Sequence, residues 1–214
     1  MTQGRRPRIA VVDHGAGNVH SVLRAFKHVG ADVSLTADSD QLRTADGVVL
    51  PGVGAFASVM AALKKGSLLR HLGYRIAGGK PVLGICVGHQ VLFTESTEGG
   101  GRTAGLDEWP GVVERLTADV VPHMGWNSVT PPQDTQLFRG IEDERFYFVH
   151  SYAVQSWDFD VVQPLMKPPM VTWSDHGGPF IAAVENGPLS SVQFHPEKSG
   201  EPGAQLIKNW METL

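Results

Sequence analysis

Cysteine is nearly absent from this sequence: Cys86 is the only one in 214 residues, so no disulfide can form within the chain. A single cysteine is typical of a protein from a reducing compartment. No apolar run has the length needed to span a bilayer. Residues 1–7 are polar and lead straight into a strand-like segment instead of an apolar signal core, so we expect a short flexible tail. The sequence thus predicts a cytoplasmic protein without membrane contact.

Strong charge and the common ligand motifs are also lacking. The net charge of −4 gives no reason to expect nucleic acid as a partner. Gly15-Ala16-Gly17 lacks the third glycine of a dinucleotide fingerprint, and no GK[ST] phosphate loop is present. The nine histidines are scattered and form no HExxH pair, so we expect neither a metal site nor a bound cofactor.

The pattern of apolar residues points to an α/β protein. A composition of 42% apolar and 19% charged residues is that of a globular protein, and the length suits one domain over residues 1–214. Strand and helix patterns alternate through the first half, which favours a mainly parallel sheet with helices on both faces. The expected strands are 9–13, 33–35, 47–50 (stopped by Pro51-Gly52) and 81–85, and the expected helices begin at Asn18, near Phe56 and after Cys86, the last one including Gln90 and Phe93.

The second half of the chain carries short β-like runs separated by glycine and proline. They indicate an antiparallel extension and hairpins joined to the same sheet. A last helix, with Leu206, Ile207 and Trp210 on one stripe, is expected to pack on that sheet. The β-like runs are 112–116, 145–154, 170–173, 180–184 and 190–194.

Gly84-Ile85-Cys86-Val87-Gly88 is the sharpest chemical signal. A nucleophile on a tight strand-to-helix turn needs small flanking residues, because side chains there would collide with the turn or with the neighbouring strand. The same turn brings the sulfur to a helix N-terminus, where the positive end of the helix dipole favours the thiolate. The alternative is a buried structural cysteine whose glycines merely form a turn.

A histidine and a glutamate follow the last β-like run, as His195-Pro196-Glu197. Just past a strand end, His195 would lie at the sheet edge where ligands usually bind. There it can take the proton of a thiol and return it to a leaving group, while Glu197 orients the ring. The alternative is a surface histidine beside a solvated charge, and the elbow cysteine argues against it.

Pro51-Gly52-Val53-Gly54 follows the third strand and opens a helix. Two glycines at this position allow peptide N–H groups to turn toward an oxyanion. The alternative is an ordinary Gly-rich turn of the kind common in α/β proteins.

An elbow cysteine, a Gly-rich loop and a late His-x-Glu, in this order, resemble the class I (triad) glutamine amidotransferases. Four segments narrow the resemblance to glutaminases that serve a cyclase in histidine biosynthesis: 50–56, 121–127, 147–152 and 193–199. The resemblance implies a flavodoxin-like fold and the release of ammonia from glutamine. It also implies a heterodimer with a (β/α)8-barrel cyclase subunit, through which the ammonia reaches a nucleotide intermediate.

The resemblance also assigns roles to single positions. Cys86 would be the nucleophile, His195 the acid and base, and Glu197 the group that orients His195. The oxyanion would be held near Val53, Gly54 and Val87. Glutamine would be bound by Gly54, Gln90, Glu98, His150, Ser151 and Tyr152, and the partner subunit would face Met124, Trp126, Tyr147 and Lys198.

Some alternatives stay open at this point. The chain could serve a different synthase, or it could be a non-catalytic subunit, although the intact triad argues against the latter. Trp126 could anchor the core instead of an interface, and Tyr147 and Tyr152 are expected on opposite faces of one strand. His89 and His14 depart from the family pattern. We expect His89 to be packed and neutral, whereas His14 leaves the detail of its loop open.

Overall fold

A parallel sheet forms the centre of the molecule. The structure is a computed structural model that describes residues 5–15, 19–65, 67–159 and 167–214. The parallel strands, in spatial order, are β13 (Leu189–Val192), β4 (Val82–Cys86), β3 (Gly47–Gly52), β1 (Arg8–Val12) and β2 (Asp32–Thr36). The antiparallel strands β12 (Pro179–Asn186) and β11 (Met170–Asp175) extend this sheet beyond β13. The predicted mainly parallel sheet with an antiparallel extension is thus confirmed.

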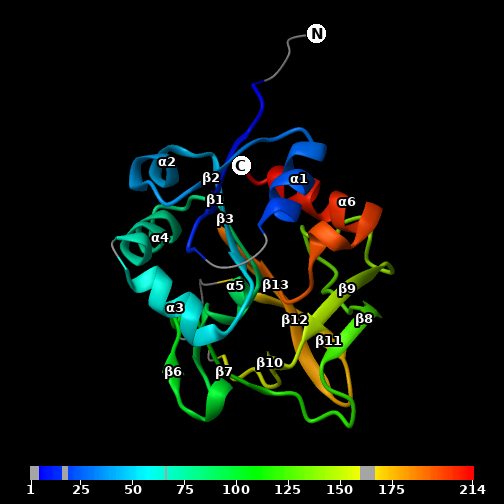
Figure 1. Ribbon diagram of the computed structural model, residues 1–214. Coiled ribbons are helices and arrows are strands. Elements are labelled where there is room, and N and C mark those ends of the chain that lie inside the picture. The colour runs from blue at the N-terminus through cyan, green and yellow to red at the C-terminus, as the bar shows by residue number, and fades with distance from the viewer. Residues whose placement is uncertain (1–4, 16–18, 66, 160–166) are drawn as a thin grey trace.

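Helices cover both faces of this sheet, as Figure 1 shows. One side carries α1 (His20–His28) and α6 (Gly200–Met211), and the other carries α2 (Ser39–Thr44), α3 (Phe56–Lys64) and α4 (Leu68–Ala77). The predicted last helix does pack on the sheet: the ring of Trp210 is fully buried and contacts Phe26 of α1, with ring centroids 5.8 Å apart. The predicted cap at Asn18 lies outside the described residues.

Two helices of the structure were not predicted from the sequence. The α2 helix begins where the Asp38 carboxylate accepts a hydrogen bond from the backbone N–H of Gln41, which is a usual helix cap. The α4 helix buries Leu68 and Leu72 at a helical spacing of four residues. The α2 helix has six residues and buries only Leu42, so it shows no hydrophobic periodicity. The α4 helix does carry an apolar stripe, and that signal was overlooked.

The third strand runs further than predicted. Pro51 and Gly52 do not stop β3 but pair with Ile85 and Cys86 of β4. Proline is tolerated in this central strand because β1 pairs with β3 only as far as Val49, so no ladder bond on that side needs the missing N–H. The strand therefore delivers Gly52 directly beside the cysteine.

The helix predicted after Cys86 is much shorter than expected. It is the four-residue α5 (Val87–Gln90), and Phe93 already begins the strand β5 (Phe93–Ser96). This prediction was wrong because the aromatic ring of Phe93 packs on Trp109 in another sheet, with ring centroids 5.6 Å apart. A dipole from so short a helix contributes little to the environment of the sulfur.

Two smaller sheets correct the expectation that every later strand joins the central sheet. One contains β10 (Tyr152–Val154), β7 (Trp109–Arg115), β5 and β6 (Thr103–Ala104), in this order. The 3-10 turn η1 (Glu98–Gly100) follows β5 in the sequence. The other pairs β8 (His123–Ser128) with β9 (Arg145–His150). The runs at 112–116 and 145–154 thus lie outside the central sheet, because an alternating pattern predicts a buried face but not the strand that pairs with it.

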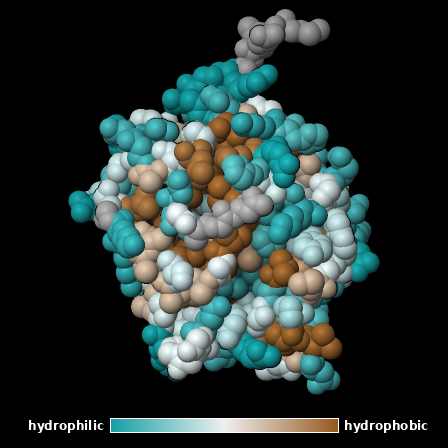
Figure 2. Space-filling view, in the orientation of Figure 1, coloured by the Kyte–Doolittle hydropathy of each residue, from teal (hydrophilic) through white to brown (hydrophobic). Residues whose placement is uncertain are grey.

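The first described residues and much of the surface of the molecule are polar (Figure 2). Arg5, within the predicted tail, forms an ion pair with Asp46 at 2.8 Å, while residues 1–4 lie outside the described part of the chain. In the view of Figure 2, hydrophobic residues gather near the centre and in smaller groups toward the lower right, with hydrophilic residues around them. Within the described ranges, none of the helices has the length and apolar character to cross a membrane.

Three glycines allow β3 and β4 to meet at the cysteine. A Cβ atom at Gly84 would lie 2.6 Å from the carbonyl oxygen of Gly88, and one at Gly88 would lie 2.0 Å from that of Leu50. A Cβ atom at Gly52 would lie 2.0 Å from the backbone nitrogen of Gly88. Backbone touches backbone here, so the expected need for small residues around Cys86 is confirmed.

We predict that Gly88→Ala destabilises the protein by about 1–3 kcal/mol or more, because the new methyl group meets backbone atoms that have no room to move. Gly73→Ala is the matched control: it adds the same methyl group to α4, where no atom lies within 4 Å. The control should be neutral or stabilising. Chemical denaturation measures both, and equal stability of the two variants would contradict the backbone contact.

Candidate active site

Cys86 sits at the junction of β4 and α5 in a strained backbone conformation. Its φ is 56° and its ψ is −112°, a combination that residues other than glycine rarely adopt. Such strain persists only where the surrounding structure holds it, here through the contacts of Gly84 and Gly88. The side chain is buried, with 6% of the residue exposed, and it points into a pocket. This geometry is that of a nucleophile elbow.

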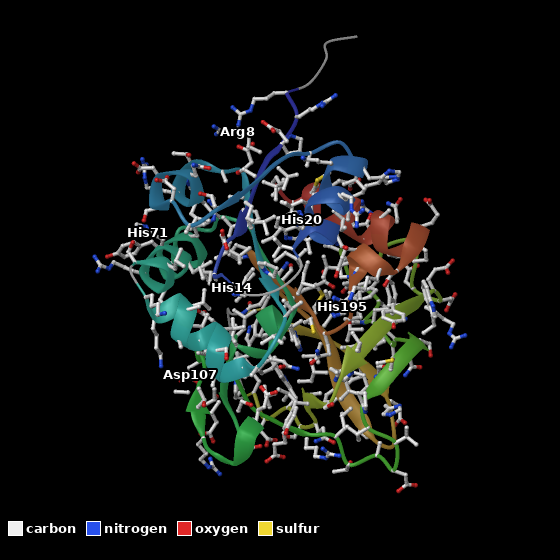
Figure 3. All side chains as sticks on the ribbon, viewed as in Figure 1. Arg8, His14, His20, His71, Asp107 and His195 are labelled. Atoms are coloured by element: carbon white, nitrogen blue, oxygen red, sulfur yellow. The ribbon has the colours of Figure 1, made fainter. Side chains whose placement is uncertain are left out.

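His195 and Glu197 lie beside this elbow because β13 and β4 are neighbours in the parallel sheet. The imidazole Nδ1 donates to Glu197 Oε1 at 2.7 Å, and less than a tenth of either side chain is exposed. Because Nδ1 bonds to Glu197, the other ring nitrogen, Nε2, is the one that can bond to Cys86. Figure 3 shows His195 near the centre of the molecule, beside α6. Glu197 itself belongs to the 3-10 turn η2 (Pro196–Lys198).

The neighbours of His195 decide its charge. Burial disfavours the imidazolium ion and lowers the pKa of His195, but the hydrogen bonds and charges of Cys86 and Glu197 outweigh burial and raise the pKa to about 9. At neutral pH the ring is therefore protonated between two groups that can carry negative charge. A protonated imidazole in this position is suited to deliver a proton to a leaving group.

The turn that carries His195 is fixed by backbone contacts from β9. The N–H of His195 donates to the carbonyl of Tyr147 at 2.9 Å, and the N–H of Tyr147 donates to the Ser199 hydroxyl at 2.9 Å. That hydroxyl in turn donates to the carbonyl of His195 at 2.7 Å. This closed set of three bonds ties the histidine to the small β8–β9 sheet.

A pocket of about 440 Å³ opens in front of Cys86. It brings together the two predicted catalytic groups Cys86 and His195, all of the predicted oxyanion positions and all of the predicted glutamine-binding positions. Glu197 lies behind His195 and does not line it. The lining residues are Gly52, Val53, Gly54, Cys86, Val87, Gln90, Glu98, Pro122, Val149, His150, Ser151, Tyr152, His195 and Lys198.

The Gly-rich segment after β3 is held at both of its ends. His14 Nε2 donates to the carbonyl of Pro51 at 2.8 Å, and the Glu98 carboxylate accepts from the N–H of Phe56 at 2.6 Å. Between these anchors Gly54 has a φ of 98°, which only glycine adopts without strain. The departure at His14 thus has a function in the loop: it holds the carbonyl that precedes the predicted oxyanion segment.

The family follows from comparison with known proteins. The model of the family "Glutamine amidotransferase class-I" matches residues 10–214. The chain belongs to this family.

Relatives place it more closely among the amidotransferases. Imidazole glycerol phosphate synthase subunit HisH of Renibacterium salmoninarum is 61% identical over 96% of this chain and 94% of its own length. The protein of the same name from Streptomyces avermitilis is 56% identical over 97% of each chain. A crystal structure of a glutamine amidotransferase is similar with a TM-score of 0.73 and 16% identity, over 95% of this chain and 97% of that one. The predicted amidotransferase fold is confirmed.

Some residues in or beside the amidotransferase pocket were missed in the sequence. Gln193 is fully buried, its Nε2 lies 3.9 Å from Cys86 Sγ, and its Oε1 accepts from Gln90 Nε2 at 3.0 Å. Gln193 precedes His195 by two residues, so strand alternation places both side chains on one face. That spacing was the available signal. Pro122 and Val149 also line the pocket and carried no signal of their own.

The two tyrosines of the 145–154 run lie apart for a reason different from the one expected. They occupy separate strands, β9 and β10, and not opposite faces of one strand. Tyr152 lines the pocket, whereas the ring of Tyr147 contacts Trp126, with centroids 6.1 Å apart. Phe146 and Phe148, which alternate with Tyr147 on β9, are fully buried and belong to the core.

The residues predicted to face a partner are divided between surface and pocket. Met124 and Trp126 are 62% and 47% exposed on β8, so Trp126 does not anchor the core. Lys198 lines the mouth of the pocket. Their role in an interface stays a prediction.

His89 does not face the nucleophile. The residue is fully buried, its Nδ1 lies 2.7 Å from the Ser191 hydroxyl, and its ring packs edge-on against Phe93. Burial is the main cause that lowers the pKa of His89 to about 3, so the ring is neutral at physiological pH. The expectation of a packed, neutral histidine is confirmed.

We predict that Glu197→Gln lowers the pKa of His195 from about 9, because the amide keeps the contact but removes the negative charge that favours the imidazolium ion. In the wild type the His195 ring stays charged up to about pH 9, whereas in the variant it loses its proton at a lower pH. NMR titration of the ring measures both values. Glu201→Gln, on the first turn of α6, is the control and should leave the pKa unchanged. An unchanged value in Glu197→Gln would refute the assignment.

Proposed function

We propose that this chain is the glutaminase subunit of an imidazole glycerol phosphate synthase in the cytoplasm, with residues 1–214 acting as one domain. It would hydrolyse glutamine to glutamate and ammonia and pass the ammonia to a (β/α)8-barrel cyclase subunit, which makes imidazole glycerol phosphate and AICAR in histidine biosynthesis. The observation that carries the chemistry is the meeting of Cys86 and His195 at one pocket, with Glu197 bonded to His195 from behind. The assignment to histidine biosynthesis draws on the names of the relatives.

The first half of the reaction forms a thioester. The Cys86 thiolate attacks the side-chain amide carbon of glutamine, and the negative oxygen of the tetrahedral intermediate is held by backbone N–H groups near Val53, Gly54 and Val87. The His195 imidazolium donates its proton to the amide nitrogen, the C–N bond breaks, and ammonia leaves. The protonated resting ring, at a pKa of about 9, suits this step.

The second half releases glutamate. Water enters where ammonia left, and the now neutral His195 takes one of its protons as the oxygen attacks the thioester carbon. The second tetrahedral intermediate collapses, the C–S bond breaks, and Cys86 leaves as the thiolate. Glu197 stabilises each imidazolium that forms, through the hydrogen bond from Nδ1.

Glutamine is oriented by the polar groups around the pocket. The Glu98 carboxylate and Gln90 Oε1 suit its ammonium group, and donors from Gly54 and Ser151 suit its carboxylate and side-chain carbonyl. Because Glu98 also caps the segment at Phe56, substrate binding and the shape of the oxyanion segment are physically linked. The glycines of this segment accept a change of peptide orientation, which makes it a two-state element that a partner can bias.

A cyclase partner would bind over Met124, Trp126, Tyr147 and Lys198. The exposed apolar side chains of β8 have the character of an interface core. Lys198 lines the pocket, and its turn η2 follows His195, whose N–H donates to the carbonyl of Tyr147. An interface over these residues would therefore cover the route by which ammonia leaves.

We predict that Cys86→Ala lowers glutamate release from glutamine by at least about 10³-fold, because no thioester can form. The measurement compares the chain alone with the chain plus cyclase subunit and its nucleotide ligand, and wild-type activity is expected to rise strongly with both. Wild-type activity in the Cys86→Ala variant would refute the mechanism. Strong activity that is indifferent to the cyclase would keep the glutaminase and discard this partner.

A further inference from the structure

A histidine outside the triad is clamped behind the pocket. The ring of His123, on β8, lies between the rings of Phe148 and His176, with centroid distances of 4.8 Å and 4.2 Å. The residue is 4% exposed. Stacking on both faces fixes the ring plane, so the two ring nitrogens point along defined directions. Nδ1 meets His150 Nε2 at 3.0 Å, and Nε2 meets Asn127 Nδ2 at 3.2 Å.

The partners of these rings allow one arrangement of protons. His150 Nδ1 lies 3.0 Å from the carbonyl of Tyr152, which only accepts, so this nitrogen carries the proton. Burial is the main cause that lowers the pKa of His150 to about 3 and that of His123 to about 4, so both rings are neutral. His150 Nε2 is then an acceptor, and His123 must donate to it from Nδ1.

Asn127 completes the chain of donors. Its Oδ1 accepts from the backbone N–H of Ser128 at 2.9 Å, which orients the amide so that Nδ2 faces His123. The same Nδ2 donates to the carbonyl of Asp175 at 2.8 Å. The bonds therefore run in one direction, from Asn127 through His123 and His150 to the carbonyl of Tyr152.

The chain of hydrogen bonds ends on the Tyr152 carbonyl, which also holds a side chain of the pocket. The Tyr152 carbonyl also accepts from Gln90 Nε2 at 2.8 Å, and Gln90 Nε2 donates in turn to Gln193 Oε1. Gln193 Nε2 faces the sulfur of Cys86. The chain of donors from β8 and the amides beside Cys86 thus meet at one carbonyl oxygen, that of the first residue of β10.

We propose that His123, oriented by Asn127, is a positioning residue for glutamine: its Nδ1–H fixes His150 and the Tyr152 carbonyl, and these set the pocket wall at 150–152 and Gln90. This inference rests on the proposed glutaminase function and deepens it. His123 touches neither the nucleophile nor the pocket, since it is absent from the residues that line the cavity. Its effect should therefore fall on the binding of glutamine and spare the chemistry at Cys86.

Two variants of His123 separate the hydrogen bond from the packing. His123→Phe keeps a ring between Phe148 and His176 but has no donor for His150. His123→Asn loses the ring but places an amide N–H close to the position of Nδ1. Loss of one buried hydrogen bond corresponds to a rise in KM for glutamine of about five- to tenfold in His123→Phe, with kcat changed little. His123→Asn should recover most of the wild-type KM.

The test is steady-state glutamate release by the chain in complex with its cyclase subunit. Alkylation of Cys86 by iodoacetamide is measured in parallel, because this small reagent does not use the glutamine-binding groups. Its rate should be equal in all variants. An unchanged KM in His123→Phe, or a fall in kcat alone, overturns the proposal. If His123→Phe does not fold, Asn127→Leu removes the preceding donor, and an unchanged KM there overturns it as well.

A measurement on the resting protein keeps this inference apart from the proposed function. Ring nitrogen shifts from ¹⁵N NMR report the tautomers of His123 and His150, and we expect the Nδ1–H form for both. The Nε2–H form in either ring overturns the inference whatever the activity. Absence of Cys86-dependent glutamine hydrolysis in the wild-type complex would instead refute the proposed function and leave the hydrogen-bond chain as a structural feature.

Discussion

The close approach of β3 to the turn after β4 is the constraint on which the site depends. Backbone meets backbone at Gly52, Gly84 and Gly88, with no space for a single added carbon. This contact holds Cys86 in a conformation that a side-chain-bearing residue does not adopt unaided. It also brings the end of β3 beside the sulfur, so that Cys86 and the predicted oxyanion segment are positioned by one and the same contact.

Burial alone would make His89, His123, His150 and His195 neutral, and the structure overrides this for one of them. His89, His123 and His150 are buried beside neutral groups, and burial lowers the pKa of each to about 3 or 4. His195 is also buried, but Cys86 and Glu197 raise its pKa to about 9. Among these four histidines the positive charge is therefore confined to the ring beside Cys86, while the neutral rings serve as directed hydrogen-bond partners.

The two small sheets provide what the central sheet lacks. The central strands supply Cys86 and His195 at their carboxyl ends, as parallel strands commonly do. The wall opposite, with His150, Ser151 and Tyr152, comes from the passage between β9 and β10, which leaves one small sheet and enters the other. The same β8–β9 pair presents Met124 and Trp126 outward and His123 inward, so one ribbon separates the surface from the pocket.

The sequence by itself determined the candidate catalytic residues and the parallel sheet that carries them. Gly84 and Gly88 around a lone cysteine, and a histidine after a buried strand, follow from local rules of sterics and strand ends, which act over a few residues. Only the tertiary structure decided which strands share a sheet, that β3 continues through Pro51, and that Phe93 leaves a helix for a strand, because pairing partners and aromatic contacts join residues far apart in the chain. The same reason hid Gln193 and the chain from Asn127 to Tyr152: hydrogen bonds between distant side chains, and the pKa values they set, exist only once the fold has brought the groups together.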